Sequence, residues 1–150
     1  MHRRRVVVTG IGALTPIGNT KDAFWDGLVS GTSGAAPITY FDASKFKTQF
    51  ACEIKNFDAQ EHFDRKEARK MDRFTQYAMV ASDEAVHDAG LDLEKIDNAR
   101  VGVIWGSGIG GLETFQNEVL NFSDGDGTPR FNPFFIPKMI ADIAPGMISI

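Results

Sequence analysis

Cysteine is almost absent from this 150-residue sequence, which holds a single one, Cys52. One cysteine excludes an internal disulfide framework and any zinc site built from several cysteines. The three histidines, His2, His62 and His87, are far apart, and none stands at a metal-ligand spacing from another histidine or from Cys52. We therefore predict no metal site.

Long apolar runs are also missing. No stretch approaches the roughly 18 consecutive apolar residues of a membrane-spanning helix. The start, MHRRRVVVTG, lacks the apolar segment that follows the basic residues of a secretory signal. The formal net charge of -4 gives no basis for global nucleic-acid binding. We expect a cytoplasmic protein that binds neither membranes nor nucleic acids.

The sequence does contain an alternation of short apolar runs and helical patterns. Two runs, residues 3–9 with VVV and residues 100–105 with VGVIW, predict strands buried on both faces, and residues 49–54 predict a further strand. Helices are predicted from residue 19 or 20 to about 30, from 64, from 72 to about 89, and from 112 to 122. This alternation is typical of an α/β layered fold.

Two boundaries of these helices carry clear signals. The sequence D-R-K-E places a capping box at Asp64 and Glu67, and Gly90 fits a left-handed C-terminal stop. Between them an alanine stripe predicts close packing against a neighbouring helix or sheet, through Ala78, Ala81, Ala85 and Ala89.

The stretch GSGIGG, residues 106–111, has the glycine spacing of a dinucleotide-binding turn. Such a site also requires a second strand ending in an acidic residue about 20 positions on, and the acids Asp124 and Asp126 follow no apolar run. We therefore favour a tight turn beside a ligand or another backbone over a nucleotide site. Ile109 within it is either packed in the core or directed into an apolar cavity.

Positive charge gathers on the helix that begins at Asp64. Arg65, Lys66, Arg69, Lys70 and Arg73 are separated by one, three and four residues, which places several of them on one side. Two interpretations remain open. The face is either solvated, with Glu61 and Glu67 as partners, or a dock for a phosphate or an acidic protein.

Cys52 is also a candidate nucleophile. A reactive thiolate needs a nearby imidazole or helix N-terminus, and FACEI is a strand-like alternation with no positive neighbour before Lys55. We interpret Cys52 as a packing residue.

Several segments, taken together and in order, resemble the first part of the β-ketoacyl-[acyl-carrier-protein] synthases, most closely the synthase II branch. They are RRVVVTGIGALTPIGN, FDASKF, KNFD, RKEARKMDRFTQYAMVASDEAVHDAGL, GSGIGGLETF and PFFIPKMIADIAPGMISI. The resemblance implies the thiolase-like fold, an α/β/α/β/α layered sandwich, with residues 1–150 forming most of its first half. It also implies a homodimer without a cofactor.

The activity that the resemblance implies is a decarboxylative condensation in fatty-acid elongation, between a cysteine-bound acyl chain and malonyl thioester on the acyl carrier protein. The family's catalytic cysteine and two histidines match no residue here, so we expect them beyond Ile150 and expect residues 1–150 alone to be inactive. A non-catalytic chain-length partner subunit is the alternative.

Binding residues do carry over by resemblance. Ile109, with Gly108, matches the gate at the mouth of the acyl tunnel. The residues that line the far end of this tunnel, across the dimer interface, match Phe134, Phe135 and Met139. The docking face for the carrier protein matches Lys66, Arg69, Lys70 and, more loosely, Arg130. Pro145 stands where the family more often has a small residue, and we expect a helix kink there.

Overall fold

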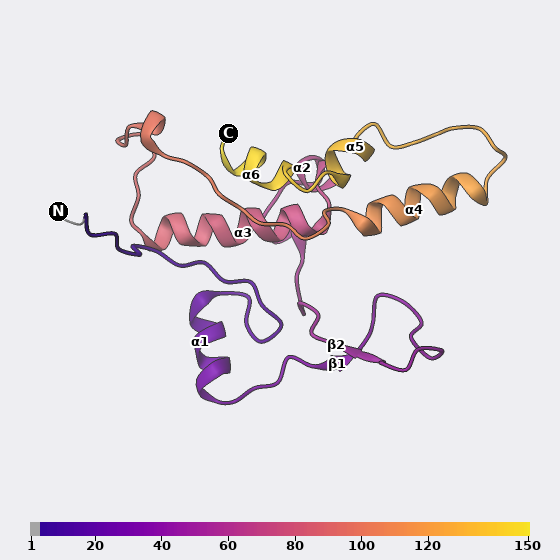
Figure 1. The fold of residues 1–150 in the computed structure, drawn as a ribbon, viewed down its shortest axis with the longest axis horizontal. Helices are drawn as coiled ribbons and strands as arrows, with labels where there is room; N and C mark the ends of the chain where they lie inside the picture. The colour runs from indigo at the N-terminus through magenta and orange to yellow at the C-terminus, as the bar shows by residue number, and fades with distance from the viewer. Residues whose placement is uncertain (1–3) are drawn as a thin grey trace. The chain divides into compact units, whose positions relative to one another are not determined.

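The structure, a computed structural model, describes residues 4–150 (Figure 1). The chain forms two compact units. The first holds the residues up to Phe57 together with Ala81–Leu91, and the second holds Asp58–Val80 and Asp92–Ile150. Helix α3 (Arg73–Asp88) contributes residues to both.

The first unit contains helix α1 (Lys21–Val29) and a small antiparallel pair of strands, β1 (Ala36–Pro37) and β2 (Phe50–Ala51). The side chain of Thr20 caps α1 by accepting a hydrogen bond from the amide of Ala23 at 3.2 Å. The helix predicted from residue 19 or 20 is therefore confirmed. The strand predicted over residues 49–54 is confirmed only at its first half, in β2.

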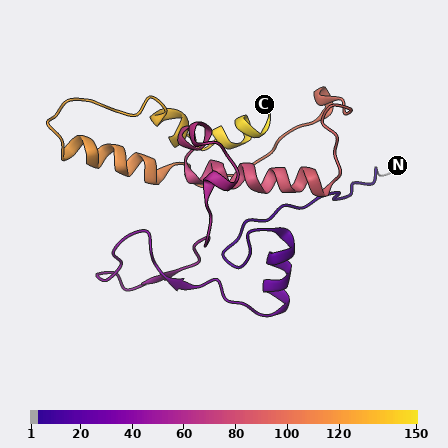
Figure 2. The ribbon, with the colours of Figure 1, turned by 180° about the vertical axis from the view of Figure 1, so that it is seen from behind.

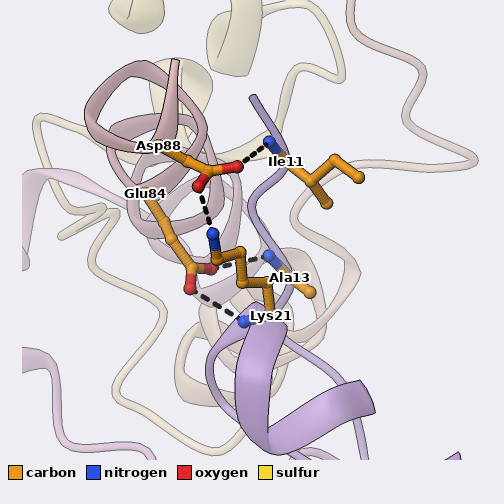
Figure 3. A network of polar contacts seen from close by, with 5 residues as sticks. All are labelled: Ile11, Ala13, Lys21, Glu84 and Asp88. Carbon is orange, nitrogen blue, oxygen red and sulfur yellow. Dashed lines mark hydrogen bonds and ion pairs between the residues drawn. The ribbon is translucent and has the colours of Figure 1, made fainter. Parts of the chain in front are cut away.

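Two carboxylates of α3 hold the chain that leads into α1 (Figure 3). Asp88 accepts a hydrogen bond from the amide of Ile11 at 2.9 Å and forms an ion pair with the ammonium of Lys21. Glu84 accepts hydrogen bonds from the amides of Ala13 and Lys21, both at 2.8 Å. Two backbone amides outside regular structure, and the first amide of α1, thus gain partners from one helix face.

The alanine stripe of α3 packs against this same leading segment. A Cβ on Gly12 would lie 1.8 Å from the carbonyl oxygen of Ala81, and one on Gly10 would lie 2.2 Å from that of Ala85. Only glycine permits so close an approach. The predicted close packing is confirmed, but the predicted partner is wrong, because the stripe packs against a segment that is neither helix nor strand.

The second unit is mainly helical. Its elements are η1 (Ala59–Glu61), α2 (Arg65–Lys70), η2 (Asn98–Arg100), α4 (Leu112–Ser123), α5 (Phe135–Met139) and α6 (Ile143–Ile148). The side chain of Asp64 caps α2 by accepting hydrogen bonds from the amides of Lys66 and Glu67, at 2.7 and 2.8 Å. Helices α4 and α5 lie side by side (Figure 1, and from behind in Figure 2).

The remaining predicted helices are also confirmed. Helix α4 matches the prediction for residues 112–122, and α3 matches that for 72–89. The latter ends as expected, with Gly90 at a φ of +62°. Within residues 4–150, no helix is both long enough and apolar enough to cross a bilayer.

Two predicted strands are wrong. Residue 3 lies outside the described part of the chain, and residues 4–9 and 101–105 form no strand. Apart from the half-buried Val103, their apolar side chains are exposed, Val6 at 94% and Ile104 at 99%. A buried strand needs neighbouring strands about 4.8 Å away to pair its amides and carbonyls, and residues 4–150 place none beside either segment.

The kink expected at Pro145 is also wrong. The helical pattern breaks earlier, at Ile140, whose backbone is extended, and resumes as α6. Pro145 is the third residue of α6, and the amides of the first helical turn have no intrahelical partner. The proline therefore costs α6 no hydrogen bond.

The Lys21 and Asp88 pair predicts a pH dependence of stability. The hydrogen bond from Lys21, followed by that from the amide of Ile11, lowers the pKa of Asp88 below 3.8. The hydrogen bond to Asp88 raises the pKa of Lys21 above 10.5. The stabilisation by Asp88 is present above pH 3.8 and is lost as the pH falls through the folded pKa of Asp88. The stabilisation by Lys21 is present below pH 10.5 and is lost as the pH rises through the folded pKa of Lys21.

We therefore expect Asp88→Asn to lower the free energy of unfolding most at neutral pH, with the difference from the parent protein shrinking toward both extremes. Urea titrations at a series of pH values measure this. Asp26→Asn, on the exposed surface of α1, is the control. A difference that does not vary with pH would contradict the assignment.

Candidate functional site

The GSGIGG turn is held against the carbonyl end of α5. The amide of Gly111 donates to the carbonyl of Met139 at 3.0 Å. A Cβ on Gly111 would lie 2.2 Å from the carbonyl oxygen of Lys138, and one on Gly110 would lie 2.3 Å from that of Met139. Gly110 also has a φ of +90°, which favours glycine. These two glycines serve the close approach of another backbone, as the sequence indicated.

This arrangement argues against the nucleotide alternative. A pyrophosphate bound by this motif would receive the amides at the N-terminus of the following helix. Here the amide of Gly111, at the start of α4, is bonded to the carbonyl of Met139, and the carbonyl of Lys138 lies against the same glycine. The place that a phosphate would need is filled by backbone oxygen atoms.

Beside the turn lies an open apolar hollow of about 510 Å³. It is lined by Ile109, Leu112, Phe115, Met139, Ile140, Ala141 and Asp142. Ile109 is 70% exposed. This exposure excludes the interpretation of Ile109 as a residue packed in the core. Its role beside an apolar cavity stays a prediction, and the structure places it at the border of the open hollow.

The structure brings together only part of the predicted apolar set. Ile109 and Met139 line the same hollow. Phe135 does not line it, and its ring stacks on Phe115 with centroids 6.2 Å apart and on Phe131 at 5.7 Å. Phe134 lines a different hollow. A Cβ on Gly108 would have no atom within 4 Å.

Sequence reasoning missed Leu112 and Phe115. Together with Ile109 they recur every three residues through the turn into α4, and three residues is close to one helical turn. That spacing was a signal that could have placed them on the same side as Ile109.

A second hollow, of about 570 Å³, is lined by several positively charged side chains. Arg69, Arg130 and Lys138 line it together with Phe134 and other residues, namely Glu118, Asn121, Phe131, Asn132 and Pro133. The structure therefore brings the predicted pair Arg69 and Arg130 together and adds Lys138, which the sequence analysis did not single out. We call this hollow the basic groove.

Charges around the basic groove are only partly compensated. Arg130 pairs with Asp126 at 3.3 Å, and a hydrogen bond from the amide of Thr128 lowers the pKa of that aspartate, so it stays ionised. Glu118 accepts from the amide of Asn132 at 3.1 Å. Arg69 forms no ion pair with the residues described, 4–150.

The other predicted docking residues lie on the exposed surface of α2. Lys70 pairs with Glu67 at 2.6 Å, and that hydrogen bond raises the pKa of the lysine. Lys66 is exposed and makes no ion pair within the described part of the chain. The solvated interpretation is confirmed for Lys70, whose partner is Glu67. The docking interpretation of this face stays a prediction.

The prediction for Cys52 is wrong within the described residues. The side chain is exposed rather than packed. It follows directly after β2, and β2 ends at Ala51. The strand expected to bury it is too short to do so.

Comparison with solved structures defines the class of protein. A chain of the structure described as "The ishigamide ketosynthase/chain length factor" superimposes with a TM-score of 0.87 and 30% identity, covering 99% of this chain and 37% of that one. A chain from a type II PKS acyl-carrier protein in complex with its ketosynthase superimposes with a TM-score of 0.78 and 27% identity, covering 98% and 38%. The fold is that of thiolase-like ketosynthase chains, as predicted.

Sequence comparison gives the family. Residues 3–150 match the model of the β-ketoacyl synthase N-terminal domain, and the chain belongs to this family. The "3-oxoacyl-[acyl-carrier-protein] synthase 2" of Synechocystis sp. is 46% identical over 150 residues. The match covers 100% of this chain and 36% of that protein, so the chain spans about a third of the relative's length. The predicted family membership is confirmed.

The glycine contacts predict a sharp difference between two substitutions. Gly111→Ala places a Cβ against the backbone at Lys138 and is expected to lower the free energy of unfolding by about 1–3 kcal/mol, since overpacked sites cost this much. Gly106→Ala in the same motif meets nothing within 4 Å. It should change stability by less than about 0.5 kcal/mol. Equal losses in chemical denaturation would contradict the close approach.

Proposed function

We propose that this chain is the first part of a β-ketoacyl-[acyl-carrier-protein] synthase II, in which it supplies the mouth of the acyl tunnel and part of the carrier-protein dock. The observation that carries the proposal is the apolar hollow that joins Ile109 of the glycine turn to Met139 of α5. The relative named above supports the reaction type. The nucleophilic cysteine and the two histidines belong to the rest of the enzyme.

In the proposed reaction the cysteine thiolate takes an acyl group from its carrier protein as a thioester. Loss of carbon dioxide from malonyl-carrier protein then leaves a carbanion, which attacks the thioester carbonyl. A carbon–carbon bond forms, the carbon–sulfur bond to the enzyme breaks, and 3-oxoacyl-carrier protein is released. No cofactor is required, and the enzyme works as a homodimer in the cytoplasm.

The apolar hollow suits the first half of this reaction. A fatty acyl chain gains about 0.8 kcal/mol for each methylene that it buries, and Ile109, Leu112, Phe115 and Met139 offer apolar surface for it. Ile109 stands at the edge of this surface between glycines. Its side chain must move for a long chain to pass, so it acts as the gate.

The basic groove and α2 suit the carrier protein. An acidic partner is attracted by Lys66, Arg69 and Arg130, and Lys138 adds a further positive group in the groove. One of the similar solved structures is a complex of an acyl-carrier protein with its ketosynthase, which supports this choice of partner. Such a dock is weak and fast and weakens with salt.

A non-catalytic chain-length partner is the second candidate. One observation favours it, namely the likeness to a structure described as a ketosynthase and chain length factor. The identity there is 30%, against 46% to a synthase 2. We therefore propose the enzyme first.

The gate is tested in the full-length enzyme by Ile109→Phe. The larger ring narrows the entrance, so kcat/KM for long acyl primers should fall at least tenfold while short primers lose less than threefold. Leu28→Phe, at an exposed position of α1, is the control and should change neither. Equal losses at all chain lengths would remove Ile109 from the gate, and a parent enzyme without condensing activity would overturn the proposed function.

The dock is tested by Arg69→Glu with carrier-linked substrate. Reversing one charge in the basic groove should raise KM about tenfold at low salt with little change in kcat, and the effect should shrink as ionic strength rises. Arg100→Glu, in η2 and outside the groove, is the matched control. If both variants behave alike, net charge rather than the groove governs carrier binding.

A further inference from the structure

A buried carboxylate in the second unit has no part in the proposed reaction. Asp72 is only 8% exposed and stands between α2 and α3. Its Oδ1 accepts a hydrogen bond from the amide of Phe74 at 3.3 Å, at the start of α3. Its Oδ2 accepts a hydrogen bond from the hydroxyl of Thr114, in the first turn of α4. One side chain thus joins the starts of two helices.

The same carboxylate borders the glycine turn. A Cβ on Gly111 would lie 2.9 Å from Oδ2 of Asp72 and 2.2 Å from the carbonyl oxygen of Lys138. Gly111 is therefore enclosed between the Asp72 carboxylate and the end of α5. Ile109, two residues earlier, is 70% exposed. The position of Ile109 depends on how firmly Gly111 and the first turn of α4 are held.

We infer that Asp72 and Thr114 are positioning residues for the Ile109 gate, and that their hydrogen bond sets which acyl chain lengths the gate admits. The inference rests on the proposed function. A hydrogen bond to a charged acceptor is stronger than one between neutral groups. Without the hydroxyl, the buried Oδ2 loses its donor and the start of α4 loses its attachment to α3, so the turn that carries Ile109 moves more freely.

Other contacts keep the rest of this region in place. The side-chain amide of Gln76 donates to the carbonyl of Ala68 at 3.0 Å, which ties α3 to α2 independently of Asp72. The amide of Gly111 remains bonded to Met139. Loss of the Thr114 hydroxyl therefore affects the turn more than the packing of the helices around it.

The test compares Thr114→Val with Thr114→Ser in the full-length enzyme. Valine keeps the branched shape and removes the hydroxyl, and serine keeps the hydroxyl. Hydrogen exchange is read at the amides of residues 109–112, and kcat/KM is read for long and short acyl primers. We expect Thr114→Val to speed exchange of these amides about tenfold and to change the long-to-short ratio of kcat/KM at least fivefold. Thr114→Ser should keep both values within twofold.

A second variant protects the test against misfolding of the first. Asp72→Asn keeps a helix-capping side chain but makes the acceptor neutral, so it should shift exchange and selectivity in the same direction as Thr114→Val and by less. Unchanged exchange at residues 109–112 in both variants would overturn the inference, as would equal kinetic losses at all chain lengths. If the parent enzyme does not condense acyl chains, the proposed function fails, and the exchange measurement still decides whether Asp72 holds the turn.

Discussion

The close approach of the GSGIGG turn to the carbonyl end of α5 is the constraint on which the candidate site depends. The amide of Gly111 bonds to Met139, and there is no room for a side chain on Gly110 or Gly111. The approach brings the start of α4 to the end of α5 and so places Ile109 beside Met139. Without it, the apolar hollow would lose one of its walls.

Local signals explain why the helices could be predicted. Two helices begin at the capping residues Thr20 and Asp64, and a third ends at Gly90. Each of these signals depends on backbone only a few residues away, so the local sequence is enough to predict it. The apolar runs containing Val6 and Ile104 carried no information on a partner strand. A strand forms only where another strand pairs with it, and residues 4–150 do not provide that partner.

The candidate site likewise has a part that the sequence predicts and a part that only tertiary packing determines. The family resemblance singled out Ile109 and Met139, and glycine spacing indicated a close backbone approach. Neither could show that Phe134 lies away from the apolar hollow or that Lys138 lies in the basic groove. Both depend on how the short helix α5 is rotated against α4. That rotation is set by tertiary packing, including the stacking of Phe135 on Phe115.

This rotation gives α5 two roles at once. Its consecutive residues Lys138 and Met139 line different hollows, the first the basic groove and the second the apolar hollow. Helix α4 is shared in the same way, through Glu118 and Phe115. In the proposed function the carrier protein and its acyl chain therefore contact different residues of the same helix pair. Because close-packed interiors transmit strain, a change in the position of α5 would alter both the dock and the gate.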